Sequence, residues 1–270
     1  MRSGRRLLAA ALAAAVVAVA APAARAAMAD RVGGTFALML PDFLQAFQPV
    51  QGMVVAVEGK EIFLDVHGGS GAQVGQEYTV FRKGDPFHHP LTGRPLGRYE
   101  DILGHAQVRR VHEQFSVGVF VPIPDRPLPA PEDGARITAG RIRVAVAPAL
   151  DMTDGRADMR RVPFLIATAL ERSKRFQVVD PLAVVEMFAS GGTRVEEILA
   201  RPERAARVAR NLEIAGWIIP ILLERGGVTY LDATYISAVT GTALFSRRLP
   251  LVRSGGVEDQ RFPWEPRAED

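Results

Sequence analysis

The sequence predicts an α+β protein, in which a small β-barrel-like domain precedes an α/β sandwich with a mixed sheet. Three observations predict this class. Five short runs of alternating apolar residues lie between residues 53 and 121, and five prolines follow at close spacing over residues 122–131. Beyond them, strand-like runs alternate with stretches of helical periodicity. We therefore expect two units, with no internal repeat relating them.

The first 26 residues have the pattern of an export signal. Arginines precede an apolar run over residues 7–21, and Ala24-Arg25-Ala26 offers small residues to signal peptidase. Ala27-Met28-Ala29 is an equally acceptable triplet, so we expect cleavage after Ala26 or Ala29. An uncleaved membrane anchor is disfavoured, because the run is short for a bilayer span and rich in weakly apolar alanine. We predict a soluble periplasmic protein with no transmembrane span after cleavage.

Removal of this segment changes the charge. The chain holds 33 Lys and Arg against 30 Asp and Glu, but residues 1–26 contain four arginines and no acid, so the remainder has net charge −1. This balance argues against a nucleic-acid partner. The chain has no cysteine. Because bacterial lipoproteins are acylated on a cysteine after the signal, we predict no lipid anchor, and stability that depends on the core alone.

An amphipathic helical segment is predicted over residues 31–50. Its apolar residues recur at spacings of three and four, namely Phe36, Leu40, Phe43, Leu44 and Phe47. Proline lacks the N–H that a helix interior requires, so we expect this short helix to begin or break at Pro41.

The β domain is predicted over residues 51–121. Its strand-like runs are 53–57, 61–66, 77–82, 104–111 and 115–121, separated by turns rich in glycine. Closure into a barrel would remove the exposed edges that make an isolated sheet adhesive. The prolines that follow predict a stiff linker over residues 122–140.

The second domain is predicted over residues 141–252, with a flexible polar tail over 253–270. Its strands are expected at 142–147, 176–180, 215–224, 228–238 and 241–251, and its helices at 160–172, 182–188, 194–199 and 202–212. This pattern predicts helices packed against a mixed sheet.

The histidines do not form a recognisable metal motif. All five lie in the first unit: His67, His88, His89, His105 and His112. Adjacent His88 and His89 point apart in an extended segment, and a spacing of seven places His105 and His112 on opposite sides of a straight strand. We expect turn and surface histidines and no metal.

No catalytic constellation is apparent either. Gly69-Ser70-Gly71 lacks the strand-elbow-helix context of a nucleophile, so a turn is expected, and no phosphate-binding glycine motif occurs. Asp151, Asp154 and Asp158 lack calcium-loop spacing, and we expect a solvated loop that caps the next helix. Glu196-Glu197 fits a polar helix face. We predict a protein that is not an enzyme, with no catalytic, cofactor-binding or metal residues and no cofactor.

The first unit shows a family pattern. Residues 52–57, 62–66 and 74–82 precede a segment that begins His89-Pro90-Leu91-Thr92-Gly93 and continues to Glu100. This resembles the C-terminal β domain of the flagellar assembly protein T family, where a similar strand pair precedes such a segment. Gly75 and Gly93 stand where the turns need positive φ.

The second unit resembles the TolB N-terminal and CsgG-like α/β module, which also occurs in lipoprotein activators of penicillin-binding proteins. The matching places are 142–147, 172–180, 217–223 and 237–241. The chain departs from these families because no propeller follows the module, no cysteine is present, and the β domain comes first. The resemblance therefore implies the architecture of the protein more directly than its function.

These observations together predict a non-catalytic periplasmic interaction protein. The expected role is assembly or stabilisation of an envelope-spanning complex of flagellar or secretion type, with envelope proteins as partners. The alternatives are an exported enzyme or ligand-binding protein with a site between the domains, or a regulator of cell-wall synthesis. No interaction face is predicted; Arg94, Arg98 and Tyr99 are exposed candidates, interpreted as solvated loop residues.

Overall fold

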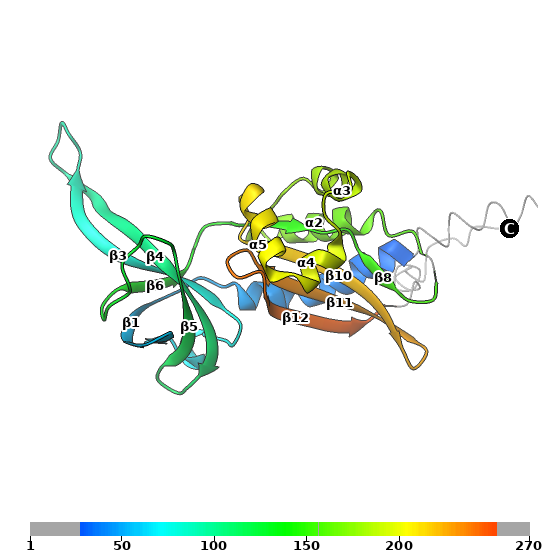
Figure 1. Cartoon of the computed structure of the whole chain (residues 1–270), viewed down its shortest axis with the longest axis horizontal. Helices are drawn as coiled ribbons and strands as arrows, with labels where there is room; N and C mark the ends of the chain where they lie inside the picture. The colour runs from blue at the N-terminus through cyan, green and yellow to red at the C-terminus, as the bar shows by residue number, and fades with distance from the viewer. Residues whose placement is uncertain (1–27, 156, 253–270) are drawn as a thin grey trace, which may run out of the picture.

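The computed structural model describes residues 28–155 and 157–252. The predicted signal peptide and C-terminal tail lie outside these ranges, apart from Met28 and Ala29 of the second cleavage triplet. Figure 1 shows a β unit at one end of the molecule and a helix-covered sheet at the other. The predicted α+β class is confirmed. Over the part of the chain that the structure describes, no helix is long and apolar enough to cross a membrane.

The N-terminal helix is continuous through Pro41, where a start or break was predicted, and it begins and ends earlier than the predicted segment 31–50. It is helical over residues 28–46, without a break at Pro41. Pro41 and Ala37, whose carbonyl loses its hydrogen-bonding partner, both lie on the exposed face, so water can replace the missing bond. The opposite face is a buried stripe that consists of Ala29, Val32, Phe36, Met39, Phe43 and Ala46.

Six strands close the first unit into a barrel, in the order β1-β2-β5-β4-β3-β6. They are β1 (Val50–Glu58), β2 (Glu61–Leu64), β3 (Glu77–His88), β4 (Pro95–Val111), β5 (Ser116–Pro122) and β6 (Gly134–Ile137). Every pairing around the ring is antiparallel. The ring therefore has no free edge strand.

The sixth strand corrects the prediction of a plain linker over residues 122–140. β6 lies between β1 and β3, where Val50 pairs with Ile137 and Thr79 with Arg136. A four-residue strand is too short to show alternation, and the neighbouring prolines obscured it. Its start is fixed by buried Asp133, which accepts hydrogen bonds from Arg82 Nε and Nη2 at 2.8 and 2.7 Å.

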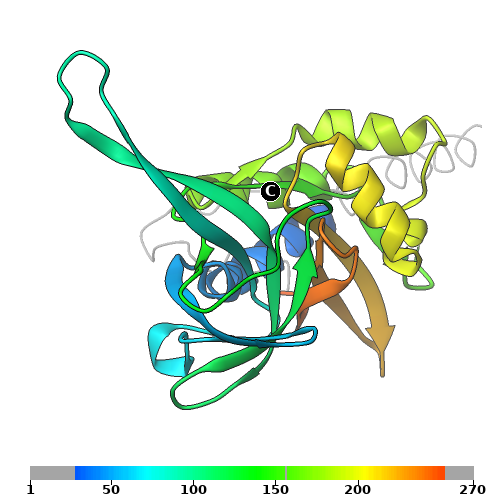
Figure 2. The ribbon, with the colours of Figure 1, turned by 60° about the vertical axis from the view of Figure 1, so that its left-hand side comes forward.

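The outer parts of β3 and β4 form a two-stranded arm over residues 83–100, which projects from the barrel (Figures 1 and 2). We predicted a solvated loop in its second half, but Arg98 and Tyr99 lie on β4. The prolines of this segment misled the prediction. Each strand of a free ribbon has an unpaired edge, and there proline removes no ladder hydrogen bond.

The second unit is a sheet of six strands in the order β12-β11-β10-β7-β9, with β8 also paired to β10. The strands are β7 (Ile142–Val146), β8 (Leu150–Met152), β9 (Phe176–Val178), β10 (Gly216–Arg225), β11 (Val228–Ser237) and β12 (Ala243–Pro250). The helices are α2 (Val162–Arg172), α3 (Pro181–Ala189), α4 (Val195–Ala200) and α5 (Pro202–Asn211). β10 pairs in parallel with β7 and antiparallel to β11, so the sheet is mixed as predicted.

The acidic loop differs from its prediction. Asp151 lies in β8, where its carboxylate accepts hydrogen bonds from the Thr153 N–H at 3.0 Å and hydroxyl at 2.6 Å. Asp158 accepts from the Arg160 N–H at 3.1 Å, and the helix α2 has Arg161 as N-cap with no side-chain cap. The aspartates therefore stabilise their own turn and do not cap the helix, which begins after two arginines.

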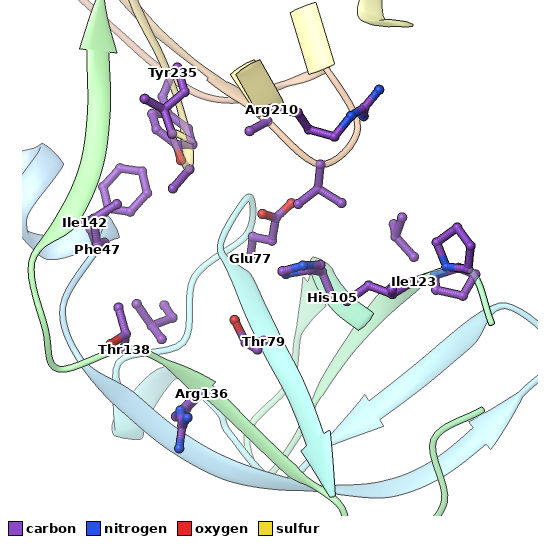
Figure 3. A pocket seen from close by; sticks show the side chains of 18 residues that line it. Phe47, Glu77, Thr79, His105, Ile123, Arg136, Thr138, Ile142, Arg210 and Tyr235 are labelled. Atoms are coloured by element: carbon purple, nitrogen blue, oxygen red, sulfur yellow. The ribbon is translucent and has the colours of Figure 1, made fainter. Parts of the chain in front are cut away.

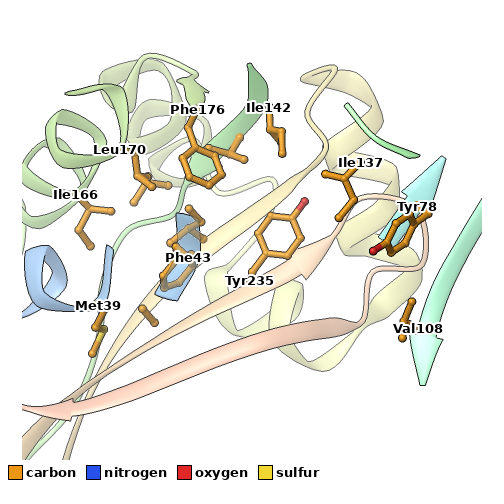
Figure 4. Close-up of a cluster of buried hydrophobic side chains, with 14 of the residues drawn as sticks. Met39, Phe43, Tyr78, Val108, Ile137, Ile142, Ile166, Leu170, Phe176 and Tyr235 are labelled. Carbon is orange, nitrogen blue, oxygen red and sulfur yellow. The ribbon is translucent and has the colours of Figure 1, made fainter. Parts of the chain in front are cut away.

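One hydrophobic core runs through both units (Figure 4). It joins Met39 and Phe43 of the N-terminal helix to Tyr78 of the barrel and Tyr235 of the sheet. A second cluster, around Trp217, packs α3, α4 and α5 on the other side of the sheet. The N-terminal helix thus belongs to the core that both units share.

Candidate interaction surface and inter-unit cavity

The tip of the arm is held by its own hydrogen bonds. The His89 N–H donates to the Arg94 carbonyl at 2.8 Å, and the Gly93 N–H donates to the His89 carbonyl at 2.9 Å. His89 Nδ1 accepts from the N–H groups of Leu91 and Thr92, both at 3.2 Å. Gly93 has φ +65°, as the sequence predicted. The tip is therefore a preorganised turn.

Apolar side chains are exposed along this arm. The rings of Phe87 and Tyr99 lie 4.9 Å apart on one face, and Gly97 opposite Phe87 leaves room for its ring. Leu91 at the tip is 90% exposed, and Leu96 is also exposed. Such a concentration of apolar groups on a protruding element is typical of a protein interaction surface.

The arm also differs in charge from the rest of the chain. Over residues 83–100, the three basic residues Lys83, Arg94 and Arg98 outnumber the two acidic residues Asp85 and Glu100, whereas the chain after residue 26 has net charge −1. Arg98 Nη1 donates to the Gly84 carbonyl at 3.3 Å, and Arg94 makes no ion pair within the described ranges. The arm is thus a basic and apolar projection.

A buried polar junction joins the barrel to the second unit. Glu77 Oε2, on β3, accepts hydrogen bonds from Gln107 Nε2 and Ser237 Oγ, each at 2.8 Å. Gln107 Nε2 also lies 2.9 Å from Thr240 Oγ1. The backbones of the two units also approach each other closely here. A Cβ added to Gly75 of the barrel would lie 2.2 Å from the Leu244 carbonyl oxygen of the second unit. The two units are therefore fitted to each other.

Arg175 forms a second junction. Its guanidinium donates to the carbonyls of Phe47 at 2.7 Å, Thr138 at 2.7 Å and Gly140 at 2.5 Å. Burial lowers the pKa of Arg175, and no carboxylate of the described chain pairs with it. One side chain from the second unit thus holds the end of the N-terminal helix and the segment that follows β6.

Between the units lies a cavity of about 480 Å³ (Figure 3). Most of its wall is apolar, including Phe47, Ile123, Ile137, Ile142, Ile214 and Val239. Glu77, His105 and Tyr235 contribute polar groups to the same space, and so do the guanidinium groups of Arg136 and Arg210. The volume lies within the range of small-molecule pockets.

Burial shifts the pKa of two of these groups. It lowers the pKa of His105, partly opposed by the charge of Glu77. It raises the pKa of Tyr235, and Glu77 adds to that rise. The imidazole and the phenol are therefore both held in their neutral forms next to a carboxylate.

The structure separates the histidines that the sequence grouped together. His67 Nδ1 accepts from the Gly69 N–H in the turn that contains Ser70, His89 closes the arm tip, and His112 stacks on Phe115. Only His105 enters the cavity. Among the residues that the structure places, no three His, Asp or Glu side chains gather as a metal site. No sequence signal could have placed His105 in a cavity, because the other walls come from distant segments.

Comparison with known proteins gives partial similarities. No family model matches the chain. An uncharacterised protein of Aquifex aeolicus (strain VF5) is 35% identical over 81 residues, which is 30% of this chain and 16% of that protein. The match thus spans about a sixth of the length of that relative.

Solved structures are similar to less than half of the chain. The C-terminal domain of LpoB from Escherichia coli aligns with a TM-score of 0.36 and 15% identity, covering 43% of this chain and 86% of that domain. The lipoprotein GNA1162 from Neisseria meningitidis aligns with a TM-score of 0.33 and 19% identity, covering 42% of this chain and 81% of that one.

Proposed function

We propose that this protein is a non-catalytic periplasmic interaction protein that binds a partner in the cell envelope through its β3–β4 arm. The arm supports this proposal because it projects from a closed barrel and exposes Leu91, Leu96 and Tyr99 beside basic side chains. A preorganised tip loses little conformational entropy on binding. The matching partner is a protein groove with an apolar floor and an acidic rim.

The export segment supports the location, and the resemblance of the two units to envelope modules supports the kind of partner. A flagellar or secretion component as partner would assign the chain to assembly or stabilisation of that machine. A cell-wall synthase would assign it to regulation of cell-wall synthesis, the alternative function. The arm fits either role, so the partner decides between them.

Site-specific photocrosslinking in cells tests this proposal. A photoreactive residue replaces Leu91 at the tip or, as the control, Met152, which is 71% exposed on the second unit. We expect one discrete crosslinked envelope protein from position 91 and none from position 152. Arg94→Glu with Arg98→Glu should abolish that product, because both would repel an acidic rim.

The full chain with its own N-terminal segment is used, and the crosslinked protein is identified by mass spectrometry. Equal crosslinking from both positions would contradict the proposal. The absence of a product from position 91, in a strain that produces the chain, would contradict it as well. A product that survives both charge reversals would assign the contact to the apolar residues alone and reject the acidic rim.

A further inference from the structure

We propose that two copies of this chain associate through the outer edge of β4 in the arm, over residues 97–102. The arm projects clear of both units (Figures 1 and 2), so this edge is open to another molecule. The envelope partner is proposed to meet the tip of the arm at Leu91, whereas the second copy meets its edge. This association goes beyond the proposed function and does not depend on it.

The outer edge of β4 is unpaired along the arm. Between Gly97 and Ile102, β4 pairs only with β3 among the described residues, because its pairing with β5 begins at Gly104. Backbone N–H and C=O groups on the other side of this stretch therefore have no partner strand within the described chain. An edge of this kind is a template for one more strand.

The other edge of the arm, on β3, is protected against such pairing. Pro86 has no N–H to donate. Two residues separate Lys83 from Pro86, but only one separates their partners Glu100 and Arg98, so the irregularity bulges from β3. Prolines and bulges are the usual means by which sheets avoid edge-to-edge contact. Over residues 97–102, β4 contains no proline.

The β4 edge is complementary in charge to a second copy of itself. Two copies of one strand related by a two-fold axis pair in antiparallel fashion. With Tyr99 opposite its own copy, Arg98 of each chain lies opposite Glu100 of the other, on the same face of the ribbon. Moving the centre by one residue would place Arg98 opposite Arg98, or Glu100 opposite Glu100. Charge therefore selects one register.

The side chains that this register brings together are accessible. Arg98 is exposed, and its guanidinium donates one 3.3 Å hydrogen bond to the Gly84 carbonyl. Glu100 is also exposed, and its ion pair with Arg136 takes one hydrogen bond on each carboxylate oxygen, which leaves further lone pairs to accept from a second guanidinium. Tyr99 is 64% exposed, so contact with a second copy removes apolar surface from water.

Sedimentation velocity of the full exported chain tests the association. So short an edge buries little surface, so we expect a weak dimer whose fraction rises with concentration between about 5 and 200 µM. A monomer at every concentration in this range would overturn the inference.

Charge exchange tests the register. Arg98→Glu and Glu100→Arg should each weaken the dimer about tenfold, because two attractive pairs become repulsive. An equimolar mixture of these variants should dimerise again, since opposite charges then meet at both positions. Arg207→Glu, at an exposed position on α5, is the control and should leave the dimer unchanged. A dimer that persists in Arg98→Glu, or a mixture of two folded variants that stays monomeric, would overturn the inference.

Single cysteines test the centre of the contact, because the chain has no cysteine of its own. Opposed residues of antiparallel strands have Cα atoms about 4.5–5.5 Å apart, a distance that a disulfide spans, so Tyr99→Cys should give a covalent dimer with a mild added oxidant. Asp101→Cys is the matched control, because it is exposed on the same strand but would lie about 13 Å from its own copy. This comparison remains decisive if Glu100→Arg fails to fold. Equal yields from both positions, or none from either, would overturn the inference.

Discussion

The carboxylate of Glu77 and the hydroxyl of Ser237 lie 2.8 Å apart, and this hydrogen bond joins the two units through residues that are 160 positions apart in the sequence. The same carboxylate oxygen holds Gln107, which in turn contacts Thr240. Because the core is also continuous between the units, the protein should unfold as one cooperative body.

Glu77→Ala should therefore destabilise the whole chain. It leaves Gln107 and Ser237 without their shared acceptor, which costs about 1–3 kcal/mol for buried donors. The measurement is urea unfolding followed by both near-UV and far-UV circular dichroism, with Glu58→Ala on the exposed end of β1 as the control. Loss of stability in both variants alike would show that the junction is not the cause.

Ser237→Ala should cost less, about 1 kcal/mol, because Gln107 keeps its acceptor. The double variant should then cost less than the sum of the two single variants, since both remove the same hydrogen bond. Strict additivity in this double-mutant cycle would contradict the contact between Glu77 and Ser237.

Gly75→Ala tests the backbone contact at the same interface. Gly75 has φ +88°, and a Cβ there would lie 2.2 Å from the Leu244 carbonyl oxygen. Gly59 is a matched control, because it has φ +61° but no atom within 4 Å of an added Cβ. Both alanines carry the cost of positive φ, about 1 kcal/mol, and only Gly75→Ala adds a clash between the units. The expected excess is about 1–3 kcal/mol in thermal unfolding, and equal losses would place the units further apart than the structure does.

The sequence predicted what local patterns encode. Alternation over residues 53–57 and 77–82 gave strands, and the spacing of Phe36 and Phe43 gave a helix. The strand β6 was missed because four residues are too few for a period to appear. The arm was missed because its prolines resemble a loop, although an unpaired ribbon edge accepts them.

The site was beyond sequence reasoning for a different reason. Glu77, His105 and Tyr235 each stand in an ordinary strand pattern, and nothing in their neighbours shows that they share a cavity. Their meeting depends on how the barrel docks on the sheet, which rests on long-range contacts such as that of Arg175 with Phe47. The sequence analysis included a site between the domains as part of an alternative function, but it named no residues for that site.

Arg175→Lys should destabilise the protein although it keeps the charge. A lysine ammonium cannot reproduce the planar fork that contacts the carbonyls of Phe47, Thr138 and Gly140. We expect a loss of about 1–3 kcal/mol in urea unfolding, because at least one buried carbonyl is left unpaired. Arg172→Lys is the control, since Arg172 is exposed on α2, and a similar loss there would show that the carbonyl contacts of Arg175 are not the cause.

The cavity histidine should make stability depend on pH. Burial lowers the pKa of His105 in the folded state below its ordinary value of 6.5, so below that pH the unfolded chain binds the proton more readily. The contribution of His105 to the free energy of unfolding is complete above pH 6.5. It falls as the pH drops, by at most about 1.4 kcal/mol per pH unit, until the folded-state pKa is passed.

Urea unfolding between pH 8 and pH 5 measures this pH dependence. His105→Gln should flatten it in this window, because glutamine does not titrate. Equal slopes in the wild type and in His105→Gln would mean that the pKa of His105 is the same in the folded and unfolded states, which would require the charge of Glu77 to cancel the effect of burial.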